Sequence, residues 1–479
     1  MDEMGHGRVV AIIDVGSNSV RLLVARELSP LAFEVIDEER FDARLAMGQK
    51  DGVLSPEGIE RGLRALRIVT QVARSHAPSI LVAAGTEALR RAPNAIDFID
   101  EVAAQTGVRI RILSGREEAF ASFLGVVNST SIRDGYLVDI GGGSLELMRI
   151  KDRVLVESRS APLGAIYAAE RFLKSDPATP REVRALRKAV RQALDVSSAQ
   201  PVLFGVGGAI RNLARYSRLR RNYPLRRVHG FAIPRTEFRR LTTILSQASI
   251  EGRRKTPGIN SWRADIIHAP AIVIDEVMKL TGAAELVVSG QGLREGLVWQ
   301  ELRGEAAILP DVRGASVSGL ARANGVDERS AEPAVHAAAA FFDATVPLHG
   351  LDASDRDLLL AAARLATIGM HVDYYNRDRH AEYLLHSGDL HGYSHREVIL
   401  LAAIVRWAQS GTPDLTPYRT LIDPSDTQRA LVLATLLGAA RAVRRRSPSP
   451  VHGLSVGLED DCLRIKLIGG DGLDVEAYE

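Results

Sequence analysis

Two short stretches of the sequence combine residue types that bind phosphate and a metal ion. They are "DVGSNSVRLLV" at residues 14–24 and "DIGGGSLELM" at 139–148, which share the pattern Asp-x-Gly-[Ser/Gly]-x-Ser. Small residues allow backbone N–H groups to converge on an anion, and an aspartate at the end of a strand can hold Mg²⁺ directly or through water. Two such turns that face each other would clamp a chain of phosphates between two lobes.

The elements that must position these turns are strands. The apolar runs "VVAII" (9–13) and "YLV" (136–138) precede the two aspartates, and β-like sequence follows each turn. The pattern is therefore strand–turn–strand, which differs from the strand–helix arrangement of P-loop and Rossmann motifs. Up to about residue 305 such runs alternate with helical ones, which indicates a mixed α/β fold. Strands are predicted at 8–15, 20–28, 33–41, 80–85, 108–113, 135–140, 145–150, 154–160, 201–206 and 284–289, and helices at 56–75, 94–106, 117–127 and 180–197.

The character of the sequence changes after this region. From about residue 306 to 445 the chain is rich in Ala and Leu and is predicted to be all-helical, with helices at 330–343, 354–370, 378–386, 395–409 and 426–445. The last segment reads as a hairpin around the glycine-rich stretch 469–472. Four domains are expected, at residues 1–130, 131–305, 306–445 and 446–479.

Six blocks, taken in order along the chain, resemble the exopolyphosphatase and guanosine pentaphosphate phosphohydrolase (Ppx/GppA) family. This family belongs to the actin, sugar kinase and heat-shock chaperone superfamily. The resemblance implies two actin-like (ribonuclease H-like) α/β lobes that face a cleft, followed by an all-helical HD-like domain and a small C-terminal β piece. The blocks are "AIIDVGSNSVRLLVA", "AAGTEALRRAPN", "ILSGREEAFASFLGV", "LVDIGGGSLELM", "FGVGGAIRNLA" and "VSGQGLREGLV".

The resemblance also implies an activity. Members of the family release terminal phosphates from inorganic polyphosphate, or the 5′ γ-phosphate of guanosine pentaphosphate (pppGpp), without a covalent intermediate. The helical module and the arginine-rich runs favour polyphosphate, but both substrates end in the same phosphoanhydride and the choice stays open. An actin-fold kinase or ATP-binding protein is a more distant alternative, which the "GREEA" block and the helical extension disfavour.

Roles for the acidic residues follow from the same resemblance. Glu118 takes the position of the family's general base, a carboxylate that orients or deprotonates the attacking water. Glu117 is interpreted as an acidic residue favoured in the first turn of a helix. Asp14, Asp139 and Glu146 are the candidate ligands of Mg²⁺, an ion that needs few carboxylates when waters and substrate phosphates complete its shell.

Phosphate contacts are predicted around both turns. Arg90 matches a family arginine that reaches phosphate, and Arg21 alternates onto the same strand face as Ser19. "FGVGGAIRNLA" lies where related folds hold an adenosine, and its glycines permit close backbone approach. The turn "SGQGLREG" is instead given a structural role before a helix. The predicted phosphate-binding residues are Gly16, Ser17, Asn18, Ser19, Arg21, Arg90, Gly141, Gly142, Gly143, Ser144, Gly207 and Gly208.

Basic residues are unevenly distributed although the net charge is only +2. The run "RNLARYSRLRRNYPLRR" (211–227) holds seven arginines and no acidic residue. A polyanion such as polyphosphate would be attracted to this surface, and a solvated basic face is the alternative. Tyr216 and Tyr223 interleave with the arginines and suggest RNA, but nucleic acid is not expected because no RNA-binding motif accompanies them.

The helical part contains a dense group of histidines but lacks the His-Asp pair of HD-type metal centres. We therefore expect a helical module for dimerisation and for extending a polyphosphate channel, and the family suggests a homodimer. The single cysteine, Cys462, excludes an intrachain disulfide and fits a reducing cytosol. No signal-like start and no membrane-length apolar run is found, so a cytoplasmic location without a membrane is expected. The histidines are His371, His380, His386, His391 and His395.

Overall fold

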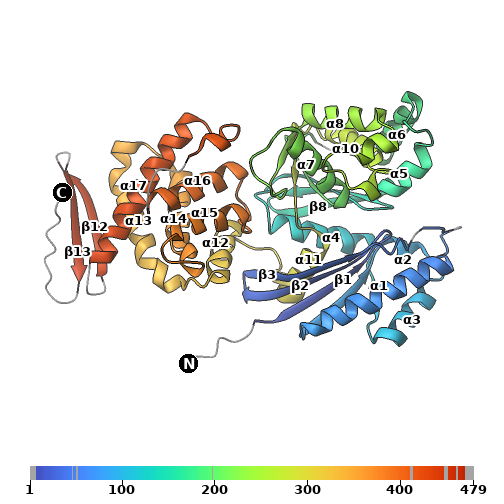
Figure 1. The fold of residues 1–479 in the computed structure, drawn as a ribbon, viewed down its shortest axis with the longest axis horizontal. Helices are drawn as coiled ribbons and strands as arrows, with labels where there is room; N and C mark the ends of the chain where they lie inside the picture. Colours follow the sequence, from blue (N-terminus) through green and yellow to red (C-terminus); the bar gives the residue numbers. More distant parts are fainter. Residues whose placement is uncertain are drawn as a thin grey trace. The chain divides into compact units, whose positions relative to one another are not determined.

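The structure is a computed structural model that describes residues 7–45, 47–49, 52–196, 198–409, 414–446, 451–459 and 462–469. It consists of two compact units that divide between Pro310 and Asp311 (Figure 1). The first unit contains two sheets with their helices, and the second contains helices and a two-stranded sheet. Among the helices described, none is long and apolar enough to cross a membrane.

The first sheet carries the first Asp-x-Gly turn. Its strand order is β3-β2-β1-β4-β5; β1, β2 and β3 form an antiparallel meander, and β4 and β5 run parallel to β1. The turn joins β1 to β2, as the strand–turn–strand pattern predicts. The strands are β1 (Val9–Val15), β2 (Val20–Ser29), β3 (Ala32–Phe41), β4 (Ile80–Gly85) and β5 (Ile110–Ile112).

The second sheet repeats this topology around the second turn. Its order is β10-β11-β9-β6-β7-β8, in which β8-β7-β6-β9-β11 corresponds to the whole of the first sheet and β10 adds an antiparallel edge. The two α/β lobes of the actin-like fold are therefore both present. The strands are β6 (Gly135–Ile140), β7 (Leu145–Lys151), β8 (Val154–Ala161), β9 (Val202–Val206), β10 (Ala232–Pro234) and β11 (Glu285–Val288).

Alternation along β1 assigns its side chains to two different cores. Ala11 and Ile13 pack with α1 and α3, whereas Val10 and Ile12 pack with α4 and α11. Helix α1 begins as its sequence predicts, with Pro56 at its first position and the Ser55 hydroxyl accepting from the backbone N–H of Gly58. The helices of this region are α1 (Pro56–Ser75), α2 (Glu87–Arg91), α3 (Ala95–Thr106), α4 (Gly115–Val127) and α11 (Leu293–Arg303).

Helix α11 brings the chain back to the first sheet after the second sheet is complete. It lies against β1 and packs closely on α4. A Cβ added at Gly296 would lie 1.7 Å from the carbonyl oxygen of Ala121, and one added at Gly125 would lie 2.2 Å from the carbonyl oxygen of Gly292. The two helix backbones therefore touch, and only glycine fits at these positions. The first lobe thus takes a helix from beyond residue 290, although its range 1–130 was predicted as contiguous.

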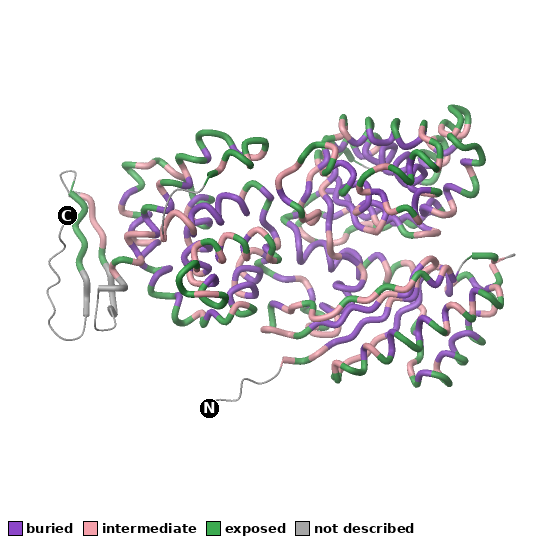
Figure 2. The backbone as a smooth tube through the Cα atoms, in the orientation of Figure 1, coloured by how far each residue is buried: buried purple, intermediate pink, exposed green. Residues whose placement is uncertain are grey.

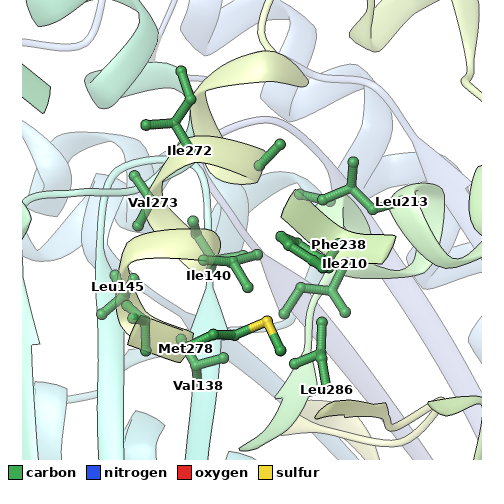
Figure 3. Packing of buried hydrophobic residues seen from close by; sticks show 14 of the residues in the cluster. Val138, Ile140, Leu145, Ile210, Leu213, Phe238, Ile272, Val273, Met278 and Leu286 are labelled. Carbon is green, nitrogen blue, oxygen red and sulfur yellow. The ribbon is translucent and has the colours of Figure 1, made fainter. Parts of the chain in front are cut away.

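The second sheet is covered by helices that form the largest core of the first unit. Val138, Ile140 and Leu145 pack against Ile272 and Val273 of α10 (Figure 3). Helix α10 is buried along nearly its whole length (Figure 2). The helices are α5 (Ala165–Phe172), α6 (Pro180–Ala193), α7 (Gly208–Arg220), α8 (Arg235–Gln247), α9 (Ile250–Arg254) and α10 (His268–Leu280), with 3₁₀ turns η1 (Ser261–Arg263) and η2 (Gly304–Ala306).

The second unit is helical up to residue 446, as predicted. The helix predicted at 354–370 ends at Leu365, because the chain tightens into a separate 3₁₀ turn, and the helix predicted to end at 343 continues to His349. The elements are α12 (Val312–Ala323), α13 (Glu328–His349), α14 (Ala353–Leu365), η3 (Ile368–His371), α15 (Arg377–Ser387), α16 (His395–Trp407), η4 (Thr416–Tyr418) and α17 (Pro424–Arg446).

A C-terminal hairpin is present, but its turn is not where the glycine-rich stretch predicted. Strands β12 (Val451–Glu459) and β13 (Cys462–Gly469) pair antiparallel, with Glu459 opposite Cys462. Gly469 is a strand residue opposite Val451, and residues 470–472 lie outside the described part of the chain. The prediction was wrong because apolar alternation through "CLRIKLIG" continues the strand to Gly469.

Candidate active site

The two Asp-x-Gly turns line one cavity of about 150 Å³ within the first unit. Each turn is closed in the same way: the N–H of Gly16 donates to the carbonyl of Ser19 at 3.1 Å, and that of Gly141 to Ser144 at 3.0 Å. The predicted convergence of the turns is thus present in the structure. Of the predicted phosphate-binding residues, those lining the cavity are Gly16, Ser17, Asn18, Ser19, Arg21, Gly141, Gly142, Ser144, Gly207 and Gly208.

Gly143 lies outside this lining and supports the contact between the lobes. A Cβ added there would lie 2.0 Å from a carboxylate oxygen of Glu87, at the start of α2. Glu87 lines the cavity and also pairs with Arg91 at 3.1 Å. Glycine at 143 therefore makes room for a carboxylate from the opposite lobe, a residue to which the sequence analysis assigned no role.

Three of the predicted acidic residues line the cavity close to one another. Asp14 and Asp139 lie near the ends of β1 and β6, and Glu118 lies in the first turn of α4. Ser122, one helical turn after Glu118, donates to Asp139 at 2.6 Å. Capping of α4 fixes this arrangement, because the Ser114 hydroxyl accepts from the backbone N–H of Glu117 and the Glu117 carboxylate accepts from the backbone N–H of Ser114.

Glu146 lies on β7 directly opposite Asp139 and is buried, with 3% exposure. It accepts a hydrogen bond from Ser160 at 3.0 Å. It does not line the cavity, although it is close enough to Glu118 for the two negative charges to interact. Glu146 therefore lies behind the carboxylates that line the cavity.

Burial is the main cause of the raised pKa values of these acidic residues. It raises the pKa of Glu118 to about 7, against the opposing effect of Arg90 and with added repulsion from Asp139. Burial, together with the charge of Glu118, raises the pKa of Glu146 to about 8. The pKa values of Asp14 and Asp139 are raised as well, again mainly by burial. Such perturbed groups in a cavity are typical of a functional site.

The acidic residues fit a magnesium ion that is shared with a substrate. Among the residues described, no three His, Cys, Asp or Glu side chains form a ready-made metal cage. Mg²⁺ needs only one or two carboxylates when waters and phosphates complete its octahedron. Asp14 and Asp139 are crowded carboxylates whose charged forms burial disfavours, and a cation would offset that cost.

Arg90 lies behind Glu118 and does not line the cavity. Its Nη1 donates to the carboxylate of Glu118 at 3.0 Å and to the carbonyl of Leu113 at 2.7 Å. In this structure it therefore holds Glu118, and a direct phosphate contact stays a prediction. Glu117 points elsewhere: it caps α4 and lies 3.6 Å from Arg111.

Arginines line the same cavity as the carboxylates, and Arg21 lies directly opposite Asp14 on the neighbouring strand. Arg21, Arg211, Arg263 and Arg294 all contribute to the lining. Burial, together with neighbouring arginines, lowers the pKa of Arg263 to about 9. Burial also lowers the pKa of Arg21 to about 10, against the opposing effect of Asp14. The Nε of Arg263 is buried without a hydrogen-bond partner in the described structure. An anion bound here would satisfy these groups.

Three of these four arginines were not predicted from the sequence as site residues. Arg211 stood within the basic run 211–227 with nothing to separate it from its neighbours. Arg294 was included in a structural turn, yet it is 5% exposed and pairs with Glu38 at 2.7 Å. Arg263 follows Trp262, whose ring lies 4.5 Å from its guanidinium carbon. A search for arginines at the starts of helices would have found Arg211 and Arg294.

The glycines before α7 bring that helix to the cavity. Gly207 has φ +113°, and a Cβ there would lie 2.7 Å from the carbonyl of Ile140. A Cβ at Gly208 would lie 2.3 Å from Arg263. The N-terminus of α7 therefore faces the cavity beside Arg263, an arrangement that favours anions.

A larger hollow of about 600 Å³ adjoins the cavity and shares Ser17 and Gly142 with it. Its lining is mixed, with Tyr167 and Trp262 beside the acidic Glu170 and the basic Arg44.

Comparison with known proteins identifies the class. The model of the Ppx/GppA phosphatase family matches residues 23–305. This chain therefore belongs to that family and is a phosphoanhydride hydrolase. Domain III of the Ppx/GppA phosphatases matches residues 312–461, which covers the helical unit.

Solved structures agree with this assignment. An exopolyphosphatase from Cytophaga hutchinsonii has 22% identity and a TM-score of 0.58, covering 63% of this chain and 99% of its own. A Ppx/GppA family member from Aquifex aeolicus has 28% identity and a TM-score of 0.55, covering 62% of this chain and 99% of its own. Together these comparisons confirm the family and the fold predicted from the six sequence blocks.

The helical histidines form no second centre in the structure described here. His386 and His395 are at least partly buried, and no group of three potential metal ligands is found among the described residues. His386 instead packs against Tyr418, with ring centroids 5.3 Å apart.

Proposed function

We propose that this chain is an exopolyphosphatase that releases terminal orthophosphate from inorganic polyphosphate with Mg²⁺ and with Glu118 as general base. The observation that carries the proposal is that Glu118 lines the same cavity as both phosphate turns. The cavity, at about 150 Å³, is large enough for the end of a phosphate chain. The cavity combines carboxylates that suit a cation with arginines that suit phosphate oxygens.

The residues divide the reaction between them. Backbone N–H groups and serine hydroxyls of the two turns bind the terminal phosphate oxygens. Asp14 and Asp139 would hold Mg²⁺, with Glu146 behind them, and the ion would neutralise charge on the transferred phosphoryl group. Glu118 accepts a proton from the water that attacks in line. Arg21, Arg211 and Arg263 bind the phosphates on the leaving side.

The direct test replaces Glu118 and keeps its neighbour as a control. Glu118→Ala should lower kcat on polyphosphate by about 10²–10⁴-fold, the usual contribution of a general base, and leave polyphosphate binding nearly intact. Glu117→Gln keeps the cap of α4 and lies outside the cavity, so its kcat should stay close to that of the wild type. Wild-type turnover in Glu118→Ala would refute the base assignment.

The second candidate is a guanosine pentaphosphate 5′-phosphohydrolase. The adjoining hollow favours it, because Tyr167 and Trp262 offer aromatic surface to a nucleobase. Side-by-side kinetics on polyphosphate and guanosine pentaphosphate distinguish the two candidates. Phosphate release without any acceptor excludes the more distant kinase alternative. The homodimer and the cytoplasmic location stay predictions.

A further inference from the structure

The arginine run 211–227 separates in the structure into engaged and free side chains. Arg220 pairs with Glu237 at 2.7 Å, and the Arg221 guanidinium lies over Phe231. Arg215, Arg218 and Arg226 form no ion pair with any carboxylate of the described residues. The basic run is therefore not a uniform solvated face, since only part of it lacks counter-charges.

The arginines without ion pairs extend along the chain from Arg211, which lines the cavity. Helix α7 begins at the cavity, and Arg211 in its first turn lines it. Arg215 and Arg218 follow at spacings of four and three residues, which places all three on one face of the helix. At 1.5 Å per residue this face extends roughly 10 Å from the cavity. Arg226, in the segment after α7, lies close enough to Arg218 for their charges to repel.

Burial and charge repulsion make the positions of these side chains unfavourable, and a bound anion would offset that cost. Arg215 is exposed, whereas Arg218 is half-buried and its Nε is buried without a partner. Burial and repulsion from Arg226 and Arg215 lower the pKa of Arg218. Like charges without counter-ions destabilise a fold. A row of such arginines that leads out of a phosphate site therefore indicates that a polyanion binds there.

The tyrosines of the run argue against RNA as that polyanion. Tyr216 is 8% exposed, and Tyr223 packs edge-on against Phe231 with centroids 4.7 Å apart. Recognition of single-stranded RNA needs aromatic faces on which bases stack. Neither ring is free to stack, so the surface offers charge without base recognition.

We propose that Arg215 and Arg218 of α7, with Arg226 in the segment after it, form a track that binds the part of a linear inorganic polyphosphate chain beyond the cavity. The proposal rests on the proposed exopolyphosphatase function and names long chains as the substrate. Arg211 joins the track to the cavity. Because the track begins outside the cavity, it contributes to long chains and is barely reached by tripolyphosphate.

The test compares chain lengths in a double variant, Arg215→Gln/Arg218→Gln. Its kcat/KM on long-chain polyphosphate should fall roughly tenfold, the combined worth of two charge contacts at the surface. The loss on tripolyphosphate should be much smaller. The KM for long chains should also depend less on salt than in the wild type, because screening has fewer contacts to weaken.

Controls separate the possible failures. Arg184→Gln changes an exposed arginine of α6 that has no ion pair among the described residues, and it should leave both substrates unaffected. Thermal melting of each variant checks the fold. Equal losses on both substrates, or tighter binding of single-stranded RNA than of polyphosphate by the wild type, would overturn the track. If the wild type releases phosphate from neither chain, the proposed function itself fails.

Discussion

At the scale of single residues, the site depends on a carboxylate that is held between opposing influences. Burial and the nearby aspartates favour the protonated form of Glu118, and the hydrogen bond from Arg90 favours the charged form. The balance leaves its pKa at about 7. A general base is most effective when its pKa lies near the working pH, because it is then both deprotonated and basic.

This balance predicts the pH dependence of turnover. The base works only as a carboxylate, so kcat should fall as the pH drops below about 7, the pKa of Glu118. Arg90→Gln removes the group that lowers this pKa, so the acidic limb of the profile should move to higher pH. The measurement is kcat against pH on tripolyphosphate at saturating Mg²⁺. An unmoved limb, or one that moves to lower pH, would show that Arg90 does not act through Glu118.

At the scale of elements, the contact between α4 and α11 holds the catalytic helix in place. Their backbones meet at Gly125 and Gly296, and α4 carries Glu118 in its first turn. The same α11 begins just after the turn that carries Gly290 and Gly292 at the cavity wall. The packing of α4 on α11 therefore positions both Glu118 and the part of the cavity wall that Gly290 and Gly292 form.

We expect Gly296→Ala to be strongly destabilising. The new methyl group would overlap the carbonyl of Ala121, and overpacking of this kind costs about 1–3 kcal/mol of unfolding free energy. Gly115→Ala is the matched control, because an added Cβ there meets nothing within 4 Å. Urea unfolding of both variants measures the difference. Equal stability of the two variants would contradict the tight helix crossing.

What the sequence reveals depends on how local the signal is. The Asp-x-Gly turns, the Ser55 cap and the first turn of α4 are set by neighbouring residues, and they were predicted correctly. The return of α11 was not, because the partners of Gly296 lie about 170 residues earlier in the chain and no local pattern encodes them. Arg211 was likewise not distinguished from the other arginines of the run, since only the position of α7 shows that it lines the cavity.

At the scale of the whole molecule, the chain consists of two units with separate cores. The two solved relatives are each matched over 99% of their length by less than two thirds of this chain. Each unit also contains a buried histidine that resists protonation: burial lowers the pKa of His268 and of His386 to about 4.

The buried histidines predict a loss of stability in acid. An unfolded histidine has a pKa near 6.5, so below that pH the unfolded state binds a proton that the folded state refuses. Stability therefore falls as the pH drops from 6.5 toward 4. At about pH 5 each histidine should cost about 2 kcal/mol.

His386→Phe should relieve this loss in the helical unit and leave the loss in the first unit unchanged. The aromatic ring keeps its packing against Tyr418 and removes the titrating group. Calorimetric melting at neutral and acidic pH, compared between wild type and variant, measures the effect. The same acid sensitivity in the variant would show that other groups dominate.

The position of α11 also determines the order in which the molecule is completed during synthesis. The first sheet leaves the ribosome early, yet one of its faces stays only partly covered until residues 293–303 have been made. The second sheet, whose strands lie within residues 135–288, has all its own strands before that. The lobe at the start of the chain is thus the last part of its unit to be completed, because α11, which packs on the helix that carries Glu118, is made after the strands of both sheets.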